Sequence, residues 1–298
     1  MRPAPLPARD GLGPARLRLR GGSVVDEFRA RFGPAAARMV LAGEVVDADG
    51  VVLDGNSVQA AGSHVYFYRE LPDEVPVPFD IPVLDRDDDI VVVDKPHFLA
   101  TMPRGRHVAQ TALVRLRREL GVPELSPAHR LDRLTAGVLL FTTRREVRGR
   151  YQTVFARGLA CKTYLARSGA AGPATLGTAV DPNMLLPRVI RNRIVKRRGC
   201  LQAVEEPGEP NAETLVELIS PDGLYRLTPR TGRTHQLRVH MASLGLPIDN
   251  DPLYPAVLDC AADDFTRPLQ LLAHTLEFDD PLTGRPRRFV SRRELAGH

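Results

Sequence analysis

Cysteine is scarce in this chain, and its distribution argues against two kinds of site. Only three cysteines occur among 298 residues, and Cys161, Cys200 and Cys260 lie far apart. An odd number at such distances indicates neither a disulfide framework nor a cysteine pair for a metal ion. The eight histidines contain no HExxH pattern, which would place two zinc ligands on one face of a helix. We therefore expect no structural metal.

Long apolar runs are also missing. No run approaches the roughly 20 residues that cross a bilayer, and no continuous apolar segment follows the first residues, which argues against a secretory signal. We expect a cytoplasmic protein that does not act at a membrane. The apolar fraction is nevertheless 43%, which suffices for the core of one large domain or two smaller ones.

Lysine is rare among the basic residues. Of the 41 basic residues, 3 are lysine and the other 38 are arginine, and the formal net charge is +5. The planar guanidinium group of arginine suits phosphates and the edges of bases. A GC-rich genome would give a similar composition, so the charge favours a nucleic-acid partner only modestly.

Composition divides the chain into four segments. Residues 1–22 are rich in proline, glycine and arginine and predict a flexible basic tail. Residues 23–70 predict a small α/β module with two helices and short strands. Residues 71–82 hold four prolines, which favours an extended linker. Residues 83–298 then form the largest domain.

Apolar patterning predicts strands and helices in this largest domain. The turn residues 221–223 join two of the strands into a hairpin. The fold class that follows is α+β, with a mixed, largely antiparallel sheet, flanking helices and a central cleft. The predicted strands are Ile90–Val93, Thr163–Arg167, Thr214–Ser220 and Leu224–Thr228, and the predicted helices are Thr111–Leu120 and Glu146–Arg157.

Two polar segments about a hundred residues apart are the most informative part of the sequence. In residues 129–137, Asp132 stands near two arginines and just before the apolar run Val138–Phe141, which predicts a buried strand. Neighbouring arginines favour the charged form of a carboxylate, which nucleophilic chemistry requires. The simpler explanation is a turn carboxylate that accepts hydrogen bonds from backbone amides.

The second segment covers residues 230–240. Thr234 is the predicted N-cap of a helix, and His235 and Arg238 share one face of it. Arg238 could reach the edge of a cleft and meet Asp132 there. On spacing alone, a surface salt bridge is the simpler explanation for Arg238.

The chain resembles the pseudouridine synthases, specifically the branch that acts on large-subunit ribosomal RNA and some transfer RNAs. The resemblance covers residues 90–290, about two-thirds of the chain, and residues 23–70 loosely resemble a small RNA-binding module. Four motifs carry it, in the order of the family: Asp94-Lys95-Pro96, His129 to Gly137, Lys162-Thr163-Tyr164, and Arg233 to His240 followed by Gly245 to Ile248.

The resemblance implies an RNA isomerase that needs no cofactor or metal. Such an enzyme breaks the glycosidic bond of a uridine, turns the base, and rejoins it through carbon. Asp132 would be the nucleophile, Arg238 would pair with it and hold it charged, and Tyr164 would lie against the base. Arg130 would fill the gap that the extruded nucleotide leaves, and Leu271 would lie under the base. The other substrate-binding residues implied are His129, Lys162, Arg233 and His235.

The sequence departs from the family pattern at several positions. Ala136 stands where serine is usual, Leu272 where histidine is common, and Asn250 where glycine is common. These departures leave the target RNA open. We expect a structured RNA as partner, ribosomal or transfer RNA, and a monomeric protein. The rival functions are an RNA-binding or ribosome-assembly factor without chemistry, and a hydrolase with a carboxylate pair. The second rival is weakened because no other carboxylate stands out near either motif.

Overall fold

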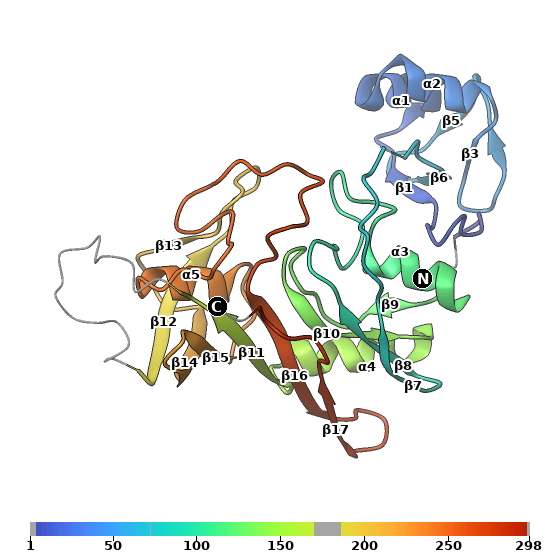
Figure 1. The fold of residues 1–298 in the computed structure, drawn as a ribbon. Helices are drawn as coiled ribbons and strands as arrows, with labels where there is room; N and C mark the ends of the chain where they lie inside the picture. Colours follow the sequence, from blue (N-terminus) through green and yellow to red (C-terminus); the bar gives the residue numbers. More distant parts are fainter. Residues whose placement is uncertain (1–3, 72, 170–185, 297–298) are drawn as a thin grey trace. The chain divides into compact units, whose positions relative to one another are not determined.

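The computed structural model describes residues 4–71, 73–169 and 186–296. The chain divides into two compact units, one of residues 1–74 with 117–123 and one of residues 75–116 with 124–298. Each unit is described on its own below (Figure 1). Among the described residues, no helix combines the length and the apolar character of a membrane span.

The described residues of the first unit include two complete helices and a small antiparallel sheet of strand order β1-β6-β3-β4. The Ser23 side chain accepts a hydrogen bond from the Asp26 N–H at the start of the first helix, as its position predicts. The two helices and the sheet share one apolar core that includes Val24, Phe28 and Val65. The elements are β1 Ala15–Arg18, β2 Gly22–Ser23, α1 Val24–Phe32, α2 Pro34–Leu41, β3 Val45–Val46, β4 Val52–Leu53, β5 Val58–Gln59 and β6 His64–Phe67.

The prediction of a flexible tail over residues 1–22 is wrong for part of that range. Residues 15–18 form β1, which pairs with β6 so that Ala15 lies opposite Phe67. Leu17 and the buried Leu19 alternate with arginines and join the core of the unit. That alternation is the strand signal, and the high content of proline, glycine and arginine around it obscured it. Residues 1–3 lie outside the described residues.

The second unit is built on a sheet in which β13-β12-β14-β15-β11-β16-β10-β8-β7 follow one another, with β17 beside β16 and β9 beside β10. The β10–β16 pair is parallel, and the other described pairs of this sheet are antiparallel. The α+β prediction is therefore confirmed.

The strands of this sheet and the remaining helices have the following bounds: β7 Val83–Arg86, β8 Ile90–Lys95, α3 Ala112–Leu120, β9 Ser126–Pro127, β10 Ala136–Thr142, α4 Arg145–Ala156, β11 Cys161–Arg167, β12 Arg188–Val195, β13 Val204–Glu206, β14 Ala212–Ser220, β15 Leu224–Pro229, α5 Gln236–Ser243, β16 Leu271–Asp279 and β17 Pro286–Val290. Each end of the strands and helices that the sequence predicts here lies within two residues of these bounds. The hairpin of β14 and β15 forms as expected.

The linker prediction is wrong from residue 75 onward. Residues 75–82 belong to the second unit, and no helix or strand is assigned to them. Ile81 is buried, and the ring of Phe79 contacts those of Phe98 and Phe265. The prolines keep the backbone extended, while the alternating Val77, Phe79 and Ile81 place apolar side chains against the core.

Gly137 lies where two strands of the sheet approach each other closely. It lies opposite Ala273 where β10 and β16 run parallel, with φ at +112°. A Cβ atom at residue 137 would lie 2.2 Å from the carbonyl oxygen of Ala273. Only glycine fits there, and it fixes where the 129–135 loop enters the middle of the sheet.

We predict that Gly137→Ala lowers the free energy of unfolding by about 3 kcal/mol or more, because the backbones must separate and the positive φ is strained. Urea-induced unfolding measures the loss. The matched control is Gly149→Ala in α4, where a Cβ atom meets nothing within 4 Å. That change should be neutral or should stabilise by about 0.5–1 kcal/mol. Equal stability of the two variants would contradict the close approach.

Candidate active site

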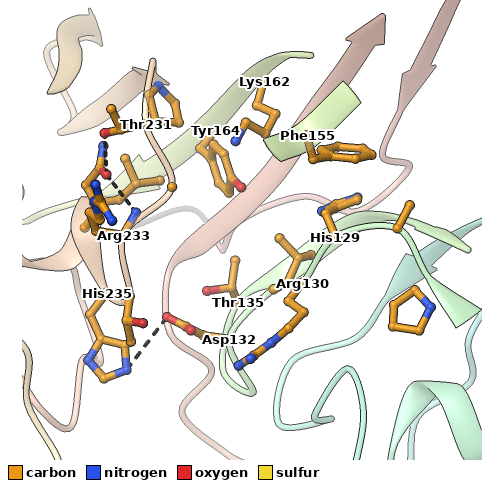
Figure 2. Close-up of a pocket in the computed structure, with 18 of the residues that line it drawn as sticks. His129, Arg130, Asp132, Thr135, Phe155, Lys162, Tyr164, Thr231, Arg233 and His235 are labelled. Carbon is orange, nitrogen blue, oxygen red and sulfur yellow. Dashed lines mark hydrogen bonds and ion pairs between the residues drawn. The ribbon is translucent and has the colours of Figure 1, made fainter. Parts of the chain in front are cut away.

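The two polar segments face one another across a pocket of about 650 Å³, a size typical of ligand sites. Figure 2 shows side chains from the 129–135 loop, from β11 and from the 230–235 segment pointing toward this space. All nine site residues expected from the sequence line it: His129, Arg130, Asp132, Lys162, Tyr164, Arg233, His235, Arg238 and Leu271.

Asp132 sits on a tight loop that enters β10. The backbone N–H of Thr135 donates to the carbonyl oxygen of Asp132 at 3.2 Å. The residue before Asp132, Leu131, is held by Thr101. The Thr101 hydroxyl donates to the carbonyl of Leu131 at 2.8 Å and accepts from its N–H at 3.1 Å. These contacts fix the backbone on both sides of Asp132, whose side chain is 29% exposed and lines the pocket.

The loop rests on a buried lysine. The ammonium group of Lys95 donates to the carbonyls of Pro96 at 2.8 Å, Leu99 at 2.7 Å and Arg133 at 3.3 Å. Burial lowers the pKa of Lys95 well below its ordinary value, while the negative charge of Asp132 opposes this shift. The Lys-Pro motif therefore ties β8 to the loop that carries the candidate nucleophile.

Arg238 pairs with Asp132 as the sequence led us to expect, and a second carboxylate that was not expected, Asp251, holds it in place. Its Nε and Nη2 donate to the two carboxylate oxygens of Asp251 at 2.7 and 2.6 Å. The remaining nitrogen, Nη1, lies 3.8 Å from Oδ2 of Asp132. Both side chains of the bidentate pair are buried, at 2% and 0% exposure. The cation that faces Asp132 is thus fixed in place by a second carboxylate.

Asp251 was overlooked in the sequence, although it comes directly after Asn250, one of the departures from the family pattern. Its Oδ1 also accepts from the N–H groups of Leu253 and Tyr254, at 2.8 and 3.2 Å. Both of its oxygens are therefore engaged, and it does not line the pocket. A second carboxylate does stand near the motif, but it is not free for the paired-carboxylate chemistry of a hydrolase.

The helix with Arg238 begins differently from the prediction. Helix α5 starts at Gln236, and His235 precedes it with a left-handed φ of 59° instead of Thr234 capping it. The side chain of Gln236 does not cap the helix but holds the turn before it, since its Oε1 accepts from the Arg233 N–H at 3.0 Å and from the Thr231 hydroxyl at 2.7 Å. In the sequence, Gln236 is a single glutamine among basic residues, and nothing in that pattern indicates that the helix begins there.

The unusual backbone of His235 aims its ring at Asp132. Nε2 lies 3.9 Å from Oδ2 of Asp132 (Figure 2), and Nδ1 lies 3.0 Å from the hydroxyl of Tyr254. Burial lowers the pKa of His235, an effect that Asp132 opposes and Arg238 reinforces. Tyr254, also overlooked in the sequence, anchors this ring by hydrogen-bonding to the backbone of Ala203.

Tyr164 stands on β11 and faces the same pocket as Asp132 (Figure 2). Burial raises the pKa of Tyr164, and the charge of Asp132 raises it further. The phenol therefore stays protonated near neutral pH. Its hydroxyl makes no hydrogen bond to the described residues and is available to a ligand. Leu271 at the start of β16 adds an apolar surface to the pocket.

His129 lines the pocket as a neutral aromatic ring. It stacks on Phe155 with the ring centroids 4.3 Å apart, and its Nε2 accepts from the backbone N–H of Leu140 at 3.2 Å. Burial and the charge of Lys162 lower the pKa of His129 to about 3. A proton on Nε2 would break the hydrogen bond to Leu140, so the ring remains uncharged.

The arginines of the two motifs take different positions. Arg130 is exposed at the mouth of the pocket, whereas Arg133 turns away and donates to the carbonyl of Phe98 at 3.4 Å. Arg233 is also exposed, and its Nε donates to the carbonyl of Asn211 at 2.9 Å. Of the two arginines close to Asp132 in sequence, only Arg130 therefore remains available to a ligand.

The site combines a carboxylate, a fixed cation, a neutral phenol and an imidazole around one cavity. This set can perform nucleophilic attack and proton transfer on a substrate that fills the cavity. Within the part of the chain that the structure describes, no group of three or more histidine, cysteine, aspartate or glutamate side chains could hold a metal ion.

The family model and the similar proteins found by comparison all point to one family. Residues 89–243, about half of the chain, match the model of the family described as RNA pseudouridylate synthase. Pseudouridylate synthase RPUSD2 of Homo sapiens is 38% identical over 181 residues, which cover 59% of this chain and 31% of that protein. The mitochondrial tRNA pseudouridine(32) synthase of Saccharomyces cerevisiae is 33% identical over 178 residues, which cover 58% and 37%. The chain thus spans only about a third of the length of these two relatives.

Other similarities extend over more of the chain. An uncharacterized RNA pseudouridine synthase of Synechocystis is 30% identical over 212 residues, which cover 70% of both proteins. Among solved structures, human RNA Pseudouridylate Synthase Domain Containing 4 aligns with a TM-score of 0.52 and 23% identity, over 72% of this chain and 88% of that chain. The structural match shows the fold alone.

We predict that Asp251→Ala lowers the free energy of unfolding by about 3–5 kcal/mol, because it leaves the guanidinium of Arg238 buried without its partner. Chemical denaturation measures the loss. The matched control is Glu277→Ala, which breaks the exposed pair with Arg288 and should leave stability nearly unchanged. A similar small effect in both variants would show that the Arg238–Asp251 pair is not a structural constraint.

The state of His129 predicts a pH dependence. Its pKa is about 3 in the folded protein against 6.5 ordinarily, so the unfolded chain takes up a proton first as the pH falls. The stability associated with the neutral ring is complete above pH 6.5 and decreases between pH 6.5 and 3. At pH 5 this effect lowers the free energy of unfolding by about 2 kcal/mol.

His129→Gln keeps an acceptor for the Leu140 N–H and removes the titration. The drop in unfolding free energy between pH 7.5 and pH 5 should therefore shrink by about 2 kcal/mol in this variant. The same measurement on the wild-type chain is the reference, since all other histidines titrate equally in both proteins. An unchanged drop would mean that His129 does not titrate as its burial implies.

Proposed function

Because the chain belongs to the RNA pseudouridylate synthase family, we propose that it isomerises uridine to pseudouridine in RNA. The observation that carries the proposal is the pocket itself. Asp132, Tyr164 and Arg238, which lie in separate motifs of the sequence, line one cavity, and the guanidinium of Arg238 lies 3.8 Å from the carboxylate of Asp132. A catalytically silent RNA-binding protein would have no need for this set.

The proposed reaction exchanges one glycosidic bond for another. The bond between N1 of uracil and C1′ of ribose breaks, the base turns, and C5 bonds to C1′ in its place. The proton that leaves C5 is matched by one that N1 gains, so no electrons are lost or gained. Asp132 is the proposed nucleophile, and the contacts of Thr101 and Thr135 hold its backbone in position.

Arg238 and Tyr164 have supporting roles in this proposal. The fixed guanidinium of Arg238 limits the positions that the Asp132 carboxylate can adopt, and it offsets the negative charge beside the substrate. Tyr164 presents a ring for stacking and a protonated hydroxyl as donor. Leu271 covers the remaining face of the base with apolar surface, and the imidazole of His235 lies beside the carboxylate.

The uridine must leave its helix to reach Asp132. Base extrusion costs a few kcal/mol, about the amount that stacking and hydrogen bonds in a fitted pocket return. Arg130, exposed beside Asp132, is the proposed residue that occupies the vacated position. The net charge is +5, and almost all of the basic residues are arginine. This charge supports attraction of the phosphate backbone of RNA. The proposed substrate is structured ribosomal or transfer RNA, bound by a monomer in the cytoplasm.

We predict that Asp132→Asn abolishes pseudouridine formation and leaves the affinity for RNA nearly unchanged. The amide keeps the shape of the side chain but is a poor nucleophile. Pseudouridine is mapped in ribosomal and transfer RNA from cells that contain the wild-type gene, the variant gene or no gene, and RNA binding is measured separately.

The matched control is Asp249→Asn, an aspartate outside the pocket that accepts from the backbone of Gly169. It should retain wild-type activity. Normal turnover by Asp132→Asn would refute the mechanism. Loss of turnover in both variants would mean that the assay reports damage to the fold rather than the chemistry of Asp132.

A further inference from the structure

We propose that the pocket has a second subsite, in which Lys162 binds a backbone phosphate next to the uridine held by Asp132. The inference rests on the proposed function and adds the place where the RNA backbone crosses the pocket. Figure 2 shows Lys162, His129 and Phe155 on one side of Tyr164, and Asp132 and His235 on the other.

Lys162 differs from the other lysines of the chain in its surroundings. The ammonium of Lys95 donates to three carbonyls, and that of Lys196 donates to the carbonyl of Cys200. Lys162 is half-buried and lines the pocket, yet it has neither a carboxylate nor a hydrogen-bond acceptor among the described residues. An enclosed charge without a partner is costly, so a ligand anion at this point would be strongly favoured.

The walls around Lys162 are suited to an anion. The neighbouring His129 ring is uncharged and stacks on Phe155, which gives an apolar side. On the other side, a Cβ atom at Gly232 would lie 4.0 Å from the ammonium nitrogen, so the absent side chain leaves the ammonium group accessible. Among the residues that the structure describes, Asp132 is the only carboxylate that lines the pocket. Burial of this unpaired ammonium also lowers the pKa of Lys162.

The distance from Tyr164 identifies the anion. Lys162 and Tyr164 are two residues apart on β11 and therefore point to the same side, about 7 Å apart along the strand. A nucleotide whose base contacts Tyr164 would carry its own phosphates at about this distance. The phosphodiester is the only anionic group in unmodified RNA, so the ligand at Lys162 is the linkage on one side of the extruded uridine.

The test combines a change in the protein with a change in the RNA. The RNA is the stem–loop that the wild-type protein binds most tightly among fragments of ribosomal and transfer RNA. Each phosphate around its uridines is replaced singly by a neutral methylphosphonate. We expect one linkage to weaken wild-type binding about tenfold. Lys162→Met should weaken binding of the unmodified RNA by a similar factor, and the same methylphosphonate should then have no further effect.

Two variants serve as controls. Lys162→Arg keeps the charge and should restore most of the affinity. Arg226→Met removes one positive charge from β15 outside the pocket, and it should retain the full methylphosphonate effect. The slope of log K against log salt should decrease by about 0.7–0.9 in Lys162→Met, as expected for one lost phosphate contact.

The subsite would be overturned if every methylphosphonate weakened binding of Lys162→Met as much as that of the wild type. This outcome differs from failure of the proposed function, which is the absence of pseudouridine in RNA treated with the wild-type protein. Unfolding curves of Lys162→Met are recorded in parallel, and the Lys162→Arg result shows whether any loss follows the charge.

Discussion

The buried ion pair between Arg238 and Asp251 is the constraint on which the rest of the site depends. Arg238 would otherwise be a flexible cation, but its bidentate bonds of 2.6 and 2.7 Å leave it a single orientation. In that orientation its third nitrogen faces Asp132. Asp251 also accepts from the backbone of Leu253 and Tyr254, so one carboxylate positions both α5 and the segment whose tyrosine anchors His235. The positions of Arg238 and His235 at the pocket therefore both depend on the buried carboxylate of Asp251.

The opposite side of the pocket is fixed by backbone contacts. Lys95 and Thr101 donate hydrogen bonds to backbone carbonyls of the loop that carries Asp132. Gly137 lets β10 lie directly against β16. These contacts restrain the loop without a substrate, which reduces the binding energy that ordering of the loop would cost. The surrounding burial keeps Tyr164 protonated and His129 neutral. Charge in the pocket is thereby restricted to a few groups, with Asp132 at one end and Lys162 at the other.

The sequence predicts the framework better than it predicts the contacts. The strand of Val138–Phe141, the helix of Val147 and Tyr151, and the hairpin at 221–223 follow from apolar periodicity and turn residues, which are local signals. The partner of Arg238 is not local, because Asp251 is brought to it by packing of α5 against a loop that has no periodic pattern. The left-handed His235 was missed for the same reason, since the start of α5 at Gln236 is fixed by contacts of the Gln236 side chain with β14. Segment boundaries failed at residues 15–18 and 75–82, where arginines and prolines hid short alternating apolar patterns.

The central claim is that an extruded uridine lies between Asp132 and Tyr164. The most direct measurement is a crystal structure of the Asp132→Asn protein bound to an RNA that contains its mapped target. We expect that uridine to be out of its helix, with its base on Tyr164 and its ribose beside residue 132, and with Arg130 in the vacated position. A bound RNA whose target uridine remains stacked, with the pocket unoccupied, would contradict the account.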